Sequence, residues 1–245
     1  MACCGAFGTY VFAARAADWR DRADALADRI GAAVTFENLS VSSGIGGDRV
    51  IEFQPVPEDM RAGYLQALDP ALAAYSKDFL RRNLSEIAVY ETMTVDGVPY
   101  GGTYDAIRKV VYLQGDRIGK PTAGFHHEFS SILLANYGLL FPAAAWREAN
   151  PAGFRYLVGD GGAGAAALAR NSDVEGGPAV YEKGFVAGYG MTRLEEDVNT
   201  YHQLLMADPA RLGLLASTYP IVARKATLLV EFLKSIGCGC VPRFR

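Results

Sequence analysis

Hydrophobic residues recur at helical spacing in several parts of the chain. In residues 13–30, Trp19, Ala23, Leu26 and Ile30 follow one another at intervals of three or four with charged residues between them, which predicts an amphipathic helix. Similar patterns, bounded by proline, glycine and capping residues, predict further helices. These are expected at residues 58–67, 70–82, 122–136 and 219–236, and from Thr192 to Asp208.

Shorter runs of β-branched and aromatic residues predict strands. They lie at residues 32–37, 49–54, 87–94, 98–104 and 109–113. Asp96-Gly97, between two of these runs, is a turn signal. Strands therefore gather in the first half of the chain and helices in the second, an order typical of the α+β class. At the start of one predicted helix, Thr192 and Glu195 have the spacing of a capping box.

The size and charge of the chain narrow the possible functions. With 245 residues, 50% of them hydrophobic, it can bury one substantial core, and we expect a single domain over residues 11–236 between tails at 1–10 and 237–245. The net charge of −3, without a basic stripe, argues against nucleic-acid binding. No apolar run approaches the roughly 18–20 residues that a membrane span needs.

All the cysteines lie near the ends of the chain, at Cys3-Cys4 and at Cys238 and Cys240. Neither pair has the separation of two to four residues found in zinc knuckles, so we expect unstructured tails. A disulfide between the two ends stays an open alternative. Ala2-Cys3 resembles the end of a lipoprotein signal. In that case Cys3 carries a lipid anchor and the protein is exported, to the periplasm or tethered to the outer membrane.

The candidate chemistry lies in the sequence F-H-H-E-F-S-S-I-L-L at residues 125–134. An H-E-x-x-H motif on a helix places two imidazoles one turn apart, where both reach one zinc ion, and its glutamate polarises the metal-bound water. His127 and Glu128 occupy the first two positions of that motif, but Ser131 stands where the second histidine belongs. The sequence therefore predicts a metal site in which one ligand has been lost or replaced.

This motif is followed later in the chain by the segment G-F-V-A-G-Y at 184–189 and by Glu195-Glu196-Asp197. Together they resemble the putative zinc-binding metallopeptidase families of the gluzincin type, many of whose members are exported bacterial lipoproteins. The resemblance covers about residues 87–236. It implies a zincin-like α+β fold, with a small twisted sheet packed on the motif helix and a mostly helical C-terminal half. It also implies zinc as the cofactor and a peptide or protein as the substrate.

Matched position by position, the resemblance implies that His127 is the first ligand, Glu128 the general base and Glu196 the third ligand. Ser131 takes the place of the second ligand. In the family the third-ligand helix typically reads E-D-F-A-E, and here Thr200 replaces the second acidic residue. The helical pattern by itself favours Glu195 over Glu196 as the inward-facing carboxylate, so both assignments stay open.

Other residues are candidates for supporting roles. His126 lies about 100° around the helix from His127 and cannot take the vacated position without unwinding that turn. His126 and His202 are therefore either recruited metal ligands or hydrogen-bonded core histidines. Tyr189 precedes the third-ligand helix, where zincins often place a hydroxyl near the oxyanion, and the alternative is a plain core aromatic. Tyr100, Gly101 and Gly102 form either an edge strand for an extended peptide or an unpartnered glycine-rich hairpin.

Two functions follow from these residues. In the first, the chain is a zinc metallopeptidase-like hydrolase with an altered metal site, and Glu128 takes a proton from bound water. In the second, it is a catalytically inactive pseudo-protease that binds peptide or glycan in the cell envelope. The metal content of protein purified without added zinc separates the two functions.

Overall fold

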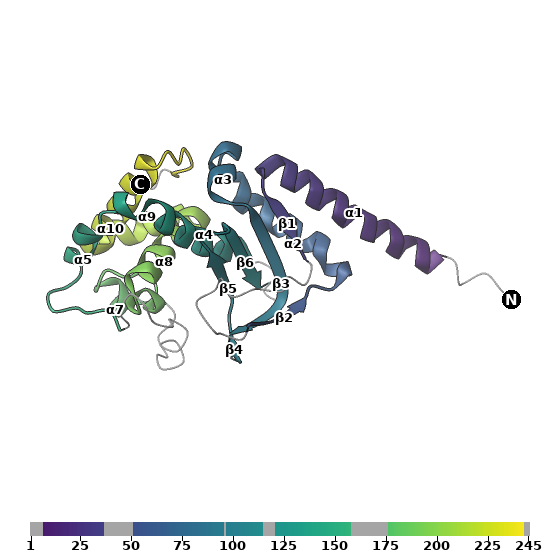
Figure 1. Cartoon of the computed structure of the whole chain (residues 1–245). Coiled ribbons are helices and arrows are strands. Elements are labelled where there is room, and N and C mark those ends of the chain that lie inside the picture. Colours follow the sequence, from purple (N-terminus) through teal and green to yellow (C-terminus); the bar gives the residue numbers. More distant parts are fainter. Residues whose placement is uncertain (1–6, 37–50, 96, 115–120, 158–175, 243–245) are drawn as a thin grey trace. The chain divides into compact units, whose positions relative to one another are not determined.

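The computed structural model describes residues 7–36, 51–95, 97–114, 121–157 and 176–242. Cys3 lies outside the described residues, so its lipidation stays a prediction. The chain divides into two compact units, one of residues 1–73 and 77–122 and the other of residues 74–76 and 123–245 (Figure 1). The first unit carries a mixed sheet and the second is helical, so the α+β class is confirmed. The single domain over residues 11–236 stays a prediction.

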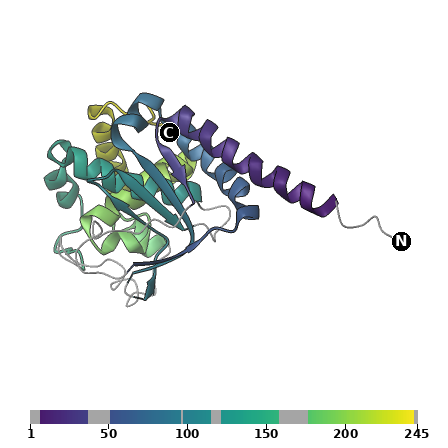
Figure 2. The same ribbon diagram turned by 45° about the vertical axis from the view of Figure 1, so that its right-hand side comes forward.

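The helices of the first unit are α1 (Phe7–Ile30), α2 (Glu58–Ala73) and α3 (Lys77–Asn83), and α1 runs alongside α2 (Figure 2). The four apolar positions predicted to face the core in α1 are all buried. The predicted break before Pro70 is wrong, because α2 continues through this residue. Leu68 and Leu72, on either side of it, are fully buried. Their burial offsets the backbone hydrogen bond that proline removes from a helix interior.

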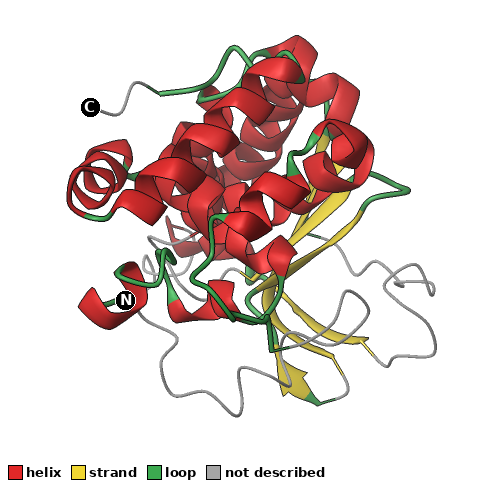
Figure 3. Cartoon of the chain, turned by 90° about the vertical axis from the view of Figure 1, so that its left-hand side faces the viewer, coloured by secondary structure: helices red, strands yellow, loops and turns green. Residues whose placement is uncertain are grey.

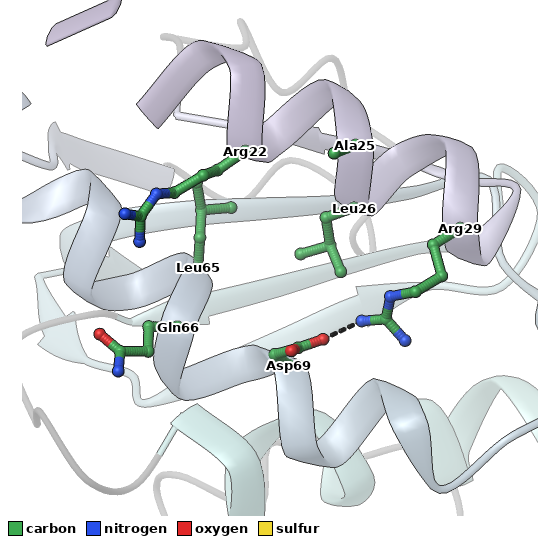
Figure 4. A pocket seen from close by; sticks show the side chains of 7 residues that line it. All are labelled: Arg22, Ala25, Leu26, Arg29, Leu65, Gln66 and Asp69. Carbon is green, nitrogen blue, oxygen red and sulfur yellow. Dashed lines mark hydrogen bonds and ion pairs between the residues drawn. The ribbon is translucent and has the colours of Figure 1, made fainter. Parts of the chain in front are cut away.

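A hollow of about 610 Å³ opens between α1 and α2 (Figure 4). An ion pair between Arg29 and Asp69 crosses it, and the apolar side chains of Leu26 and Leu65 form part of its wall. The complete lining is Arg22, Ala25, Leu26, Arg29, Leu65, Gln66 and Asp69. None of the residues proposed above for catalysis or metal binding belongs to this lining.

Among the residues that the structure describes, the sheet has six strands arranged around one long central strand. They are β1 (Ala33–Thr35), β2 (Ile51–Pro55), β3 (Glu86–Val95), β4 (Val98–Pro99), β5 (Gly102–Asp105) and β6 (Val110–Gln114). The first half of β3 pairs in parallel with β1 and β6, and its second half pairs antiparallel with β2 and β4. Ala88, for example, lies between Thr35 on one side and Tyr112 on the other. The predicted strands are confirmed over the described residues, except that residues 98–104 form two short strands. Residues 37, 49 and 50, at the ends of two predicted strands, lie outside the described residues.

The segment at Tyr100, Gly101 and Gly102 joins these two short strands. Tyr100 packs against the core cluster that includes Tyr90 and Tyr112, and the Gln114 amide donates to the Gly101 carbonyl at 3.0 Å. Gly102 begins β5, the last strand in the sheet order, and the strands that the structure describes pair with only one edge of β5. This agrees with an edge strand, whereas peptide pairing along it stays a prediction.

The second unit is built from helices (Figure 3). They are α4 (Pro121–Tyr137), α5 (Ala143–Glu148), α7 (Pro178–Tyr181), α8 (Leu194–Ala207), α9 (Pro209–Thr218) and α10 (Pro220–Ser235), with short 3-10 helices η1 (Gly138–Leu140) and η2 (Gly188–Met191). In α4, Phe125, Phe129 and Ile132 are completely buried. The motif at residues 125–134 therefore lies on a core helix, as predicted.

The predicted capping box at the start of α8 is wrong. Arg193 is the N-cap residue and makes no side-chain capping bond. Thr192 ends η2 in a helical conformation, so its hydroxyl bonds back to the Tyr189 carbonyl at 2.8 Å instead of forward into α8. Glu195 instead forms an ion pair with Arg193 at 3.2 Å. The acidic side chains in the first turn of α8 still favour the positive end of the helix dipole.

Candidate functional site

The motif histidine of α4 and a glutamate of α8 form a buried ion pair. His127 Nε2 lies 2.9 Å from Glu196 Oε2, and His127 Nδ1 lies 3.1 Å from Gln203 Oε1. Because both ring nitrogens face oxygen atoms, the imidazole is doubly protonated and donates to both. The second oxygen of Glu196 accepts from Arg193 Nε at 3.1 Å and from Arg193 Nη2 at 2.8 Å. Of the two carboxylates left open by the sequence, Glu196 is thus the one that meets His127.

The protonation of this pair follows from its surroundings. Burial alone would lower the pKa of His127, but the hydrogen bond to Glu196 and the negative charges of Glu128 and Glu196 raise it to about 9. Burial alone would raise the pKa of Glu196, but the hydrogen bond and charge of His127, together with Arg193, lower it to about 2. Both groups are therefore charged at neutral pH.

Glu128 lies close enough to this pair to respond to its charges. Burial raises the pKa of the Glu128 carboxyl, and the positive charge of His127 opposes this rise. The negative charges of Glu196 and Glu195 add to it, and the resulting pKa is about 7. Both the protonated and the ionised form of Glu128 are therefore populated near neutral pH. A pKa near the working pH is what a general base requires.

Tyr189 of η2 packs directly on the pair. Its ring stacks on that of His127, with centroids 5.8 Å apart and an interplanar angle of 15°. Burial, together with the charge of Glu196, raises the pKa of Tyr189, so its hydroxyl stays protonated. The hydroxyl therefore donates a hydrogen bond to Glu196. Gly190 allows η2 to approach α8 closely, because a Cβ there would lie 3.2 Å from Asp197 Cα and 3.1 Å from Thr200 Oγ1.

Ser131, which the motif resemblance assigns to the second metal ligand, takes part in a neutral hydrogen bond. Ser131 lies one turn beyond His127 on α4, and Asn199 lies one turn beyond Glu196 on α8. Asn199 Nδ2 donates to Ser131 Oγ at 2.7 Å, and both side chains are buried. The other amide atom, Asn199 Oδ1, is buried without a hydrogen-bond partner in the described part of the chain.

His126 and His202 belong to a separate polar cluster around Tyr75. His202 Nδ1 donates to the His126 carbonyl at 2.9 Å, so His202 Nε2 is the acceptor nitrogen. The Tyr75 hydroxyl lies 3.3 Å from this nitrogen and 2.8 Å from His126 Nδ1. The consistent arrangement has His126 donating to Tyr75 and Tyr75 donating to His202. Burial lowers the pKa of His126 to about 3 and that of His202 to about 4, so both rings are neutral core groups.

One buried ion pair was not anticipated from the sequence. Lys225 Nζ lies 2.7 Å from Asp197 Oδ2, and neither side chain is exposed. The same oxygen accepts from Trp146 Nε1 at 2.8 Å and from the Tyr156 hydroxyl at 2.7 Å. The signal in the sequence was a lysine inside the apolar face of α10, where Val222, Ala226 and Leu229 are buried. The pair joins α8 to α10 one residue away from Glu196.

The predicted metal ligands therefore fall into three groups. His127, Glu196 and Glu195 are linked through Arg193, Ser131 pairs with Asn199, and His126 and His202 both contact the Tyr75 hydroxyl. Among the residues that the structure describes, no three His, Cys, Asp or Glu side chains are placed to hold one metal ion. These donors do not fit the three protein ligands of a catalytic zinc.

Comparison of the chain with protein-family models, with curated proteins and with solved structures finds no match in any of the three. The metallopeptidase resemblance therefore rests on the motif residues alone. Within the described part of the chain, no helix combines the length and the apolar character of a membrane span.

Proposed function

We propose that this chain is a zincin-like, gluzincin-type pseudo-protease that binds a peptide in the cell envelope without zinc-dependent cleavage. The observation that carries the proposal is the 2.9 Å ion pair between His127 and Glu196, next to the Ser131–Asn199 hydrogen bond. Each position where the gluzincin pattern expects a zinc ligand has its hydrogen bonds satisfied by another side chain.

The energetics of this arrangement oppose zinc binding. A zinc-bound histidine must be neutral, whereas the pKa of His127 is about 9. Removing its proton at pH 7 costs on the order of 3 kcal/mol before any metal bond forms. Ser131 offers only a neutral hydroxyl, which already accepts from Asn199. Both terms lower the affinity for zinc relative to a site with two imidazoles.

The same site retains a group that suits a peptide. Glu128 is partly exposed, so its carboxylate is open to a ligand. Carboxylate oxygens of this kind accept from main-chain amides and amino groups. The choice of a peptide over a glycan rests on the family resemblance of the motif.

Hydrolysis is the second candidate, and one observation favours it. The pKa of Glu128, about 7, gives this carboxylate the basicity needed to take a proton from water at neutral pH. The two candidates share a binding step and differ only in turnover.

Metal content provides the first test. We expect protein purified without added zinc, then dialysed against a mild chelator, to contain far less than one zinc per chain by elemental mass spectrometry. In parallel, the same protein is screened against a mixed peptide library by affinity selection. Stoichiometric zinc after dialysis would overturn the proposal. If neither wild type nor the Tyr189→Phe variant retains any peptide, the proposed binding role is wrong.

A further inference from the structure

The C-terminal end of α10 holds a cysteine in a fixed position. Gly237 has a φ of +76°, its amide donates to the Lys234 carbonyl at 3.0 Å, and the Cys238 amide donates to the Leu233 carbonyl at 2.9 Å. These two bonds form a Schellman motif, in which the residue after the left-handed glycine packs back on the last turn. Cys238 occupies that place and is only 4% exposed.

The chain then reaches a second cysteine after one residue. Cys238 and Cys240 form a disulfide. Gly239 between them is exposed, and a Cβ there would meet no atom within 4 Å. Cys240 is more exposed than Cys238. An incoming thiol therefore reaches the sulfur of Cys240 first.

This disulfide contributes little as a structural crosslink. A crosslink stabilises a fold mainly by restricting the unfolded chain, and the effect decreases as the closed loop becomes shorter. The loop here contains a single residue between the two cysteines. The end of α10 is already held by the two backbone hydrogen bonds at Gly237 and Cys238. Stabilisation alone does not account for a disulfide at this place.

The geometry points to a thiol–disulfide exchange site at Cys238 and Cys240, whose partner is a thiol or dithiol of a small molecule or protein. The partner thiolate attacks Cys240 Sγ and forms a mixed disulfide, while the bond between the two cysteines breaks and Cys238 leaves as a thiolate that takes up a proton. A second thiolate of the partner then attacks its own sulfur in the mixed disulfide and releases Cys240. Two electrons pass from the partner to the protein, and the reverse sequence returns them.

The test uses the full chain carrying Cys3→Ser and Cys4→Ser, so that only the C-terminal pair titrates. The folded protein is equilibrated in mixtures of reduced and oxidised glutathione, and its free thiols are then alkylated. Intact-protein mass spectrometry counts the alkylated thiols. We expect two thiols to appear together, reversibly, with a midpoint that follows the square of reduced over the first power of oxidised glutathione. A pair that stays oxidised in every mixture and opens only in denaturant would overturn the proposal. The proposal would also be wrong if oxidised glutathione did not convert the two reduced thiols back to the disulfide.

Two single variants in that background assign the roles of the sulfurs. Cys238→Ser should accumulate a stable mixed disulfide at Cys240, because no second sulfur remains to displace glutathione. Cys240→Ser should form its mixed disulfide at Cys238 about tenfold more slowly, since that sulfur is buried. Equal rates in the two variants would contradict the assignment. Both variants should melt close to the background protein, which separates loss of exchange from loss of fold.

Discussion

Asn199 on α8 donates a 2.7 Å hydrogen bond to Ser131 on α4, and both side chains are buried. The bond sits one helical turn from the ion pair between His127 and Glu196. A short hydroxyl at position 131 leaves room for an amide from the facing helix, and the amide in turn ties the two helices together. Position 131 thus makes a local polar contact that does not need a metal.

An imidazole at position 131 tests whether α4 and α8 can present a set of metal ligands. We expect Ser131→His combined with Asn199→Ala, which makes space for the larger ring, to raise zinc affinity above that of wild type by titration calorimetry. The matched control is Ser131→Ala, which leaves Asn199 without its partner and should lower stability by about 1–3 kcal/mol without any gain in zinc affinity. A folded double variant that binds zinc no better than wild type would show that α4 and α8 do not present a ligand set.

The hydrophobic side of the motif should matter more to stability than its acidic side. Phe129 is fully buried, with its ring centroid 5.3 Å from that of Phe125 and 5.2 Å from that of Tyr75. We expect Phe129→Ala to cost about 3–5 kcal/mol in the free energy of unfolding. Glu128→Ala removes a partly buried carboxyl whose raised pKa already signals an unfavourable site for charge, so its cost should be small. Denaturant unfolding of both variants measures the difference, and comparable losses would contradict the orientation of α4.

The ion pair also fixes how stability changes with pH. His127 has a pKa raised from 6.5 to about 9, so its contribution is complete below pH 6.5 and is lost as the pH rises through 9. Glu128, raised from 4.5 to about 7, acts in the same direction at lower pH. Glu196, lowered from 4.5 to about 2, contributes above pH 4.5 and loses its contribution only as the pH falls toward 2. We therefore expect the free energy of unfolding to fall between pH 7 and 9.5.

The variant Glu196→Gln isolates this effect. Without the carboxylate, the protonated imidazole of His127 loses its main stabilising partner, and the pKa of His127 falls. The decline in the free energy of unfolding above pH 7 should therefore be shallower than in wild type. Chemical denaturation at several pH values measures both slopes. Parallel curves for the two proteins would mean that His127 is not protonated in the folded state.

The buried pair of Asp197 and Lys225 makes a separate prediction. Lys225→Met removes the positive charge and leaves Asp197 buried, which should cost about 3–5 kcal/mol in unfolding free energy. Adding Asp197→Asn removes the stranded charge, so the double variant should recover part of that loss. A double variant less stable than Lys225→Met alone would show that the pair is not the source of the effect.

The sequence predicts the elements well where the signal is local. The apolar period of α1 and the alternation in β3 are properties of neighbouring residues, and both elements form where expected. The predictions at Pro70 and Thr192 were wrong because local patterns do not contain what decides them. The helix at Pro70 depends on the burial of its neighbours, and the hydrogen bond of Thr192 depends on the 3-10 helix before it. The same limit applies to the site. The motif indicated His127 and left the choice between Glu195 and Glu196 open, and the hydrogen bond from Asn199 to Ser131 joins residues far apart in sequence.

The last prediction separates the two candidate functions. Glu128→Gln keeps the size and hydrogen-bonding capacity of the side chain but cannot accept a proton from water at neutral pH. If Glu128 works as a base, wild type should hydrolyse some members of a broad peptide library and the variant should not, while both retain the same melting temperature. We expect instead that the two proteins are equally inert, with and without added zinc, because Ser131 is engaged with Asn199 and His127 is held as an imidazolium by Glu196. The measurement is product formation by mass spectrometry over long incubation. A slow turnover that depends on zinc and disappears in Glu128→Gln would reverse this expectation and make the chain an enzyme.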